Sequence, residues 1–273
     1  KLGCATWELD MLLTDTNPDP NIIDKRITDA VLQNISRMNR MRTQFALDWH
    51  VVHSLYNSID HNIYVDRNED GAPAVQTLYQ RLFRNKLVDA VASFPPSPNQ
   101  ITGTIADKIP GILAAFRIKE ADLNLILTDL SLIESASLDS IILSHIYRIT
   151  VLAQALGLNI DAFLRLKRLW AQDPFADPRS TQKFVKLAQQ IAASDFSVIE
   201  LDYLLAHRFT PNSGVALDDK TIVTILQAIQ EGLQKISIDI RLKTEETKDA
   251  YVKSKLGLLP VLGKDADQTI ALS

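Results

Sequence analysis

The chain has 273 residues, of which 46% are hydrophobic and 23% are charged, and its formal net charge is −4. This length and composition are typical of one or two globular domains with a sizeable core. The weak negative charge excludes a strongly basic surface for nucleic acid or an anionic membrane. A lone cysteine, Cys4, excludes an intrachain disulfide, although not an extracellular destination.

The two ends of the sequence predict a piece of a longer chain. The chain starts at Lys1 without a recognisable secretory leader, and no apolar run reaches the ~18–20 residues that a membrane helix needs. Residues 266–273 read as the beginning of a further helix.

The first predicted helix contains the stretch ELDMLL at 8–13, and almost the same stretch, ELDYLL, returns at 200–205. In the second copy Ser197 and Glu200 match the S-x-x-E capping box, in which each side chain binds the other residue's backbone amide. Phe196 precedes this cap in the position of a hydrophobic staple. The apolar residues that follow share one helical face, which we expect to be buried: Leu201, Leu204 and Leu205.

The same pattern recurs along the chain: an apolar residue precedes an N-cap, and further apolar residues follow at four to eight positions after that cap. The predicted cap positions are Ala5, Asp48, Arg117, Asn159 and Ser197. Asp48, Asn159 and Ser197 are favourable N-caps, whereas Ala5 and Arg117 are poor ones. Most of the spacings are roughly forty residues, in the range of two-helix repeats. Chance similarity among leucine-rich helices is the alternative.

Amphipathic helices also precede three of these caps. Their apolar faces are formed by Ile27, Val31, Ile35 and Met38, by Leu143, Ile146, Tyr147 and Leu152, and by Phe184, Leu187 and Ile191. We therefore predict an all-α protein, an irregular α-solenoid-like stack of helical hairpins in which each unit needs its neighbours to bury its apolar face. Helical hairpins over 1–58 and a hairpin stack over 104–273 would flank a loop-rich insertion at 59–103.

Strand signals are weak. Residues 63–65 allow a short extended piece, and the alternation at 236–240 equally continues a helix. Within the insertion we predict a short helix over 78–87, and Pro95, Pro96 and Pro98 should stop any helix there.

One segment of the insertion, Asp66 to Gly71, matches the first half of an EF-hand loop. Calcium needs six to eight oxygen ligands, and this loop normally ends with a bidentate glutamate at position 12. Here that position is Thr77, and Pro73 interrupts the loop. A polar turn is the better interpretation, and a calcium-regulated module built on this loop remains an alternative.

We find no convincing catalytic or metal site, and predict that the chain is not an enzyme and needs no cofactor. His50 and His53 can share a helical face near Asp48 and His61, but a closed zinc shell needs three or four ligands. The common hydrolase and nucleotide-binding signatures are absent from the sequence. Three further features fit ordinary structural roles: Cys4 as a small core residue, Glu245-Glu246 on a solvated helix, and Trp7, Trp49 and Trp170 in the core.

Several segments resemble the A component (TcA) of bacterial insecticidal Tc toxin complexes. The strongest are LSHIYRITVLAQALGLNIDAFLRLKRL, a following DPF, and STQKFVKLAQQIAASDFSVIELDYLL, with LYNSIDH, QTLYQRLFRNK and KLGCATWELDMLL upstream. The resemblance covers roughly 1–208. It departs from the family pattern at Cys4, where an aromatic or small residue is expected.

The resemblance implies an architectural role. Proteins of this family are secreted homopentamers that bind host cells, insert a helical channel into the membrane, and pass a toxic enzyme supplied by the B and C components. The matching region belongs to the helical shell around the channel. A free-standing helical-repeat scaffold that binds another protein is the alternative function.

Overall fold

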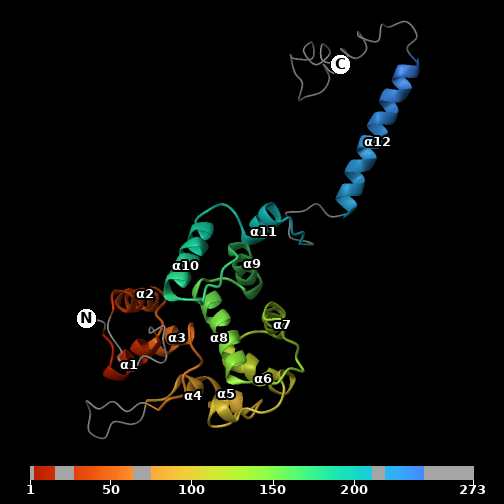
Figure 1. The fold of residues 1–273 in the computed structure, drawn as a ribbon. Helices are drawn as coiled ribbons and strands as arrows, with labels where there is room; N and C mark the ends of the chain where they lie inside the picture. The colour runs from red at the N-terminus through yellow and green to blue at the C-terminus, as the bar shows by residue number, and fades with distance from the viewer. Residues whose placement is uncertain (1–2, 16–27, 64–74, 211–218, 243–273) are drawn as a thin grey trace. The chain divides into compact units, whose positions relative to one another are not determined.

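The computed structural model describes residues 3–15, 28–63, 75–210 and 219–242, and it divides into two units, 1–208 and 209–273. Figure 1 shows a helical protein: the described residues contain no strand, only isolated bridge residues such as the antiparallel pair Thr104 and Ser137. The predicted all-α class and helical stack are confirmed. The proposed boundaries after residues 58 and 103 remain a prediction.

The larger unit contains short to medium helices connected by tight turns. They are α1 (Thr6–Asp15), α2 (Asp29–Phe45), α3 (Trp49–Ser54), α4 (Leu78–Phe83), α5 (Lys86–Asp89), the 3₁₀-helix η1 (Pro98–Gln100), α6 (Ile105–Phe116), α7 (Glu120–Asp129), α8 (Ser140–Ala155), α9 (Ile160–Trp170), α10 (Pro178–Ala192) and α11 (Val198–Ala206). Helix α8 runs through the middle of this unit and contacts α3, α7 and α9 (Figure 1). The single helix expected over 78–87 is two helices, because Asn85 caps a new one.

Three of the helical hairpins have turns with the same backbone geometry. At each turn a residue with positive φ, namely Ala46, Arg117 or Gly157, lies two positions before the next N-cap. The residue between them donates its amide to a carbonyl five positions back, at 3.0–3.3 Å, in Leu47–Arg42, Ile118–Leu113 and Leu158–Ala153. This bond is the long-range bond of a Schellman motif, which satisfies carbonyls at a helix end. The hairpin repeat therefore has a defined backbone geometry.

Four of the five predicted caps are correct in position. Asp48, Asn159 and Ser197 cap α3, α9 and α11, and α1 begins directly after Ala5. Arg117 is wrong, because it ends α6 with φ 56° and the next helix starts after Lys119. The correct frame lies two residues later. Its apolar face consists of Leu123, Ile126 and Leu127, which are all buried, whereas Leu125 of the predicted frame is 39% exposed.

The buried side chains form two clusters. A small N-terminal core joins α1, α2 and α3 through Leu12, Ile35, Met38 and Trp49. A larger core extends from α2 and α3 through to α11 and includes Phe83, Phe163 and Phe184, each completely buried. At roughly 25 cal/mol for each Å² of apolar surface removed from water, this burial is the main favourable contribution to folding.

The two copies of the opening motif differ in burial. In ELDMLL, Met11 and Leu12 are 4% and 0% exposed. In ELDYLL, Leu204 and Leu205 are 53% and 69% exposed, and the staple residue Phe196 is 53% exposed. The expectation that Leu204 and Leu205 are buried is therefore wrong for the described structure. The helix forms as predicted, but the N-terminal copy lies against α3, whereas the second copy is uncovered on this side.

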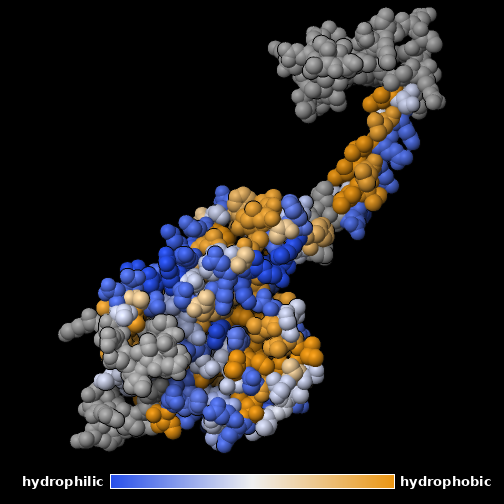
Figure 2. Space-filling view, viewed as in Figure 1, coloured by the Kyte–Doolittle hydropathy of each residue, from blue (hydrophilic) through white to orange (hydrophobic). Residues whose placement is uncertain are grey.

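The smaller unit contains α12 (Asp219–Leu242), a 24-residue helix. Residues 236–240, for which a strand was the alternative, belong to this helix. Its apolar side chains lie along one side and its polar side chains along the other (Figure 2). The apolar residues Ile222, Leu226, Ile229 and Leu233 are each 39–62% exposed.

Among the helices described here, none alone is long and apolar enough to span a membrane, although α8 and α9 together pass that test as a pair bent by 99°.

Candidate functional site

The segment Tyr56 to Asp60 joins several helices of the larger unit. The Tyr56 hydroxyl donates to Thr181 Oγ1 on α10 at 2.9 Å, and the Ile59 amide donates to Ser144 Oγ on α8 at 2.9 Å. The Asp60 carbonyl accepts the Tyr79 amide at the start of α4, at 3.0 Å. This hub segment therefore connects parts of the chain that are far apart in sequence.

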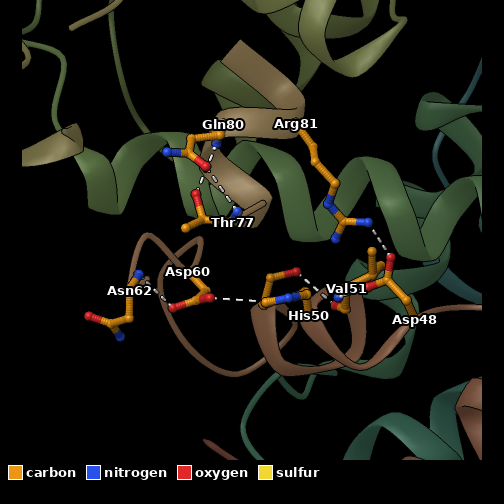
Figure 3. A network of polar contacts seen from close by, with 9 residues as sticks. Asp48, His50, Val51, Asp60, Asn62, Thr77, Gln80 and Arg81 are labelled. Carbon is orange, nitrogen blue, oxygen red and sulfur yellow. Dashed lines mark hydrogen bonds and ion pairs between the residues drawn. The ribbon is translucent and has the colours of Figure 1, made fainter. Parts of the chain in front are cut away.

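At the end of the hub lies a buried pair between Asp60 and His50. The Asp60 Oδ2 lies 3.1 Å from His50 Nδ1, and the two side chains are only 1% and 6% exposed. Asp60 Oδ1 accepts the Asn62 amide at 3.1 Å (Figure 3). On α1, the Trp7 ring lies 4.9 Å from the His50 ring, centroid to centroid. The pair thus fixes the chain after α3 against the helix itself.

The surroundings of Asp60 favour its ionised form. Burial alone would raise the pKa of this carboxyl, but the hydrogen bonds from His50 and from the Asn62 amide outweigh burial and hold the pKa below the usual value of 3.8.

A second, more exposed ion pair lies on the same side of α3. Arg81 Nη1 of α4 donates to Asp48 Oδ2 at 2.6 Å, and Asp48 Oδ1 caps α3 through the Val51 amide at 2.9 Å. Thr77 and Gln80 form the capping box of α4 (Figure 3). Burial tends to raise the pKa of Asp48, but the bond from Arg81 and the Val51 amide lower it overall.

This network is built to hold helices together. Its carboxylates are occupied by a histidine, an arginine and backbone amides, so neither is placed to activate a nucleophile. His50 and His53 are 5% and 8% exposed, while His61 is exposed. Within the described residues, no three His, Cys, Asp or Glu side chains are arranged to hold a metal ion. Cys4 is half-buried beside the N-terminal core.

The Trp predictions hold in part, since Trp49 is 2% exposed while Trp7 and Trp170 are half-buried. Asp66 to Gly71 and Glu245-Glu246 lie outside the described residues.

Sequence reasoning missed two buried carboxylates. Asp60 lies in a loop, and nothing in its local pattern indicates His50 as a partner. Asp202 lies within ELDYLL, is 0% exposed, and binds Arg165 Nη1 at 3.0 Å and Arg208 Nη1 at 3.2 Å. An aspartate between apolar residues on a predicted helix was the available signal, because a buried charge needs a partner.

Comparison with solved structures finds the same fold in two larger proteins. The cryo-EM structure of TcdA4 from Morganella morganii is 16% identical with a TM-score of 0.52, over 74% of this chain and 9% of that chain. The cryo-EM structure of TcaA-TcaB from Yersinia pseudotuberculosis is 12% identical with a TM-score of 0.51, over 98% of this chain and 14% of that chain. No family model and no curated protein matches. This chain therefore shares its fold with a small part of each of these Tc proteins.

Proposed function

We propose that the chain is a segment of the helical shell of a Tc toxin A subunit, a pore-forming protein that translocates a toxic enzyme into host insect cells. The observation that carries the proposal is the fold shared with TcdA4 over 74% of this chain. The sequence resemblance over roughly 1–208 supports the same assignment, and it rests on different information, namely the ordered series of hairpin motifs.

The pattern of burial fits an architectural role. The polar network around Asp60 connects helices, and its carboxylates are fully used for that purpose. The exposed leucines of α11 form an apolar surface, of the kind that marks contact with further protein.

In this proposal the intact protein is a secreted homopentamer that acts at the host cell membrane. It joins the B and C components, while other domains contact the host cell. The segment described here has no enzymatic activity and binds no cofactor.

The first experiment is to determine the mass and shape of the intact protein by light scattering and negative-stain imaging. The proposal predicts a pentamer of long chains with a central stalk. A monomer of about 30.5 kDa, the mass of this chain, would contradict it and favour the free-standing protein-binding scaffold.

Adding millimolar calcium to the 273-residue chain tests the remaining alternative, because a ligand that binds only the folded state raises the melting temperature. The shell proposal predicts no calcium-specific shift.

A further inference from the structure

A pocket of about 340 Å³ lies between the middle of α8 and the end of α9. His145 and Arg148 of α8 line one wall, Lys167 and Arg168 of α9 line another, and Asp173 and Phe175 of the following turn complete it. This volume is within the range of small-molecule sites. Neither the hairpin repeat nor the hub segment accounts for the concentration of basic side chains here.

The positive charge of the pocket is only partly balanced. Lys167 pairs with Asp129 through its ammonium group. Arg148 and Arg168 form no ion pair with any residue that the structure describes. Asp173 is the one acidic residue among the described residues of the lining, and its Oδ1 accepts the Phe175 amide at 3.0 Å. Among the residues that the structure describes, the lining therefore carries a net positive charge.

The guanidinium of Arg148 is only partly satisfied by the residues that the structure describes. Its Nη2 donates to the Asn57 carbonyl at 3.2 Å, and its guanidinium lies 5.8 Å from the centre of the Phe175 ring. Its Nε is buried and has no hydrogen-bond partner among the residues that the structure describes. Burial also lowers the pKa of Arg148, a shift that Asp173 only partly offsets. A guanidinium has five N–H donors, so tethering the hub segment uses a small part of its capacity.

We propose that this pocket binds a small oxyanion, a phosphate or carboxylate ligand, through Arg148 and Arg168. A guanidinium presents paired donors that match both kinds of oxyanion. The anion would supply a negative counter-charge for the half-buried guanidinium of Arg148. Phe175 and Ile149 give the pocket apolar walls against which the rest of a small ligand can pack. This assignment is independent of the proposed role in a toxin shell.

The test is calorimetric titration of the 273-residue chain with inorganic phosphate and, separately, with acetate, both in chloride buffer at constant ionic strength and neutral pH. We expect saturable binding of at least one anion. Preference for phosphate would identify a phosphate-bearing ligand, and equal or stronger binding of acetate would identify a carboxylate. Absence of saturable binding of both anions at millimolar concentrations would overturn the proposal.

Variants separate the pocket from non-specific salt effects. Arg148→Met should weaken binding by at least about tenfold, since hydrogen bonds to charged groups contribute more than one decade in affinity. Arg168→Met replaces an exposed side chain, so it should fold normally and weaken binding severalfold even if the Arg148 variant is unstable. Arg40→Met, an exposed arginine on α2 outside the pocket lining, is the matched control. Equal affinities in wild type and Arg168→Met would contradict the proposal.

Discussion

Asp202 places a buried carboxylate within the ELDYLL motif of α11. It is fully buried and accepts hydrogen bonds from Arg165 of α9 and from Arg208, just beyond α11. Arg165 also binds Asp161, whose side chain is 37% exposed. The same arginine therefore has one buried and one partly solvated partner, which allows the two environments to be compared directly.

Replacing Asp202 should be costly. Asp202→Asn leaves Arg165 without its buried counter-ion, and breaking such a pair by removing one partner costs about 3 kcal/mol of unfolding free energy. Asp161→Asn should cost no more than about 1 kcal/mol, because partly exposed ion pairs contribute little. Urea unfolding of both variants measures the difference. Equal losses would show that burial does not determine the strength of these contacts.

The Asp60–His50 pair makes stability depend on pH in a defined direction. Because the pKa of Asp60 in the folded state lies below its usual 3.8, the unfolded chain binds the proton more readily. The stabilisation is therefore complete well above 3.8 and is lost as the pH falls through the lowered pKa of the folded state.

Asp60→Asn tests this dependence. The variant should lose about 1–3 kcal/mol of unfolding free energy at neutral pH, the usual cost of removing a hydrogen bond to a charged group. Its stability should also fall less steeply than that of wild type on acidification below about pH 5. Asp195→Asn, an exposed residue, serves as the control. Parallel pH profiles for wild type and Asp60→Asn would contradict this account.

At the level of the element, the recurrent hairpin turn depends on one residue with positive φ. L-amino acids other than glycine pay roughly 1–2 kcal/mol in this conformation, and glycine avoids that cost while losing more chain entropy on folding. The chain uses alanine, arginine and glycine at the three equivalent positions 46, 117 and 157. These turns therefore differ in strain although their hydrogen bonds are the same.

Exchanging residues at these turns should shift stability in opposite directions. Gly157→Ala should lower the unfolding free energy by about 0.5–1 kcal/mol through backbone strain alone, since a Cβ at Gly157 meets no atom within 4 Å. Arg117→Gly should raise it by a similar amount. Ala193→Gly provides the control, because Ala193 has φ −88° and gains nothing from glycine. Urea midpoints at unchanged m-value measure each effect, and stabilisation by Ala193→Gly would show that φ is not the cause.

Local signals explain why four of the five predicted helix starts are correct. Ser197 and Glu200 satisfy each other's backbone amides within four residues, and in the first copy Glu8 likewise accepts the Ala5 amide at 2.7 Å. The Arg117 cap was misplaced because Phe116 and Ile118 are both apolar and both precede a basic residue, so two frames were possible. Only the positive φ of Arg117 and the bond from Ile118 decide between them.

Contacts between residues far apart in sequence could not be predicted from local patterns. His50 finds Asp60 only because the chain turns back after α3, and Arg148 reaches Asn57 across 91 positions of sequence. Amphipathic spacing identifies a face that favours burial, but whether that face is covered depends on the elements beside it. The two nearly identical motifs on α1 and α11 show this difference directly.

For the whole molecule, equivalent leucines in these motifs should have very different effects. Leu12→Ala removes a completely buried side chain of the N-terminal core and should cost about 2–5 kcal/mol of unfolding free energy. Leu204→Ala, at the equivalent position but 53% exposed, should change stability by about 0.5 kcal/mol or less. Urea unfolding of the 273-residue chain distinguishes the two.

In the intact protein, substitutions at Leu204 should matter more than they do in the isolated chain. If the chain is a shell segment, as proposed, the exposed face of α11 packs against further protein there, and a charge on that face becomes a buried, unpaired charge. Leu204→Asp combined with Leu205→Asp should then leave the isolated chain folded but lower the yield of assembled particles in light scattering and negative-stain images. Normal assembly of this double variant would show that the α11 face stays in contact with water, and the apolar surface would need a different explanation.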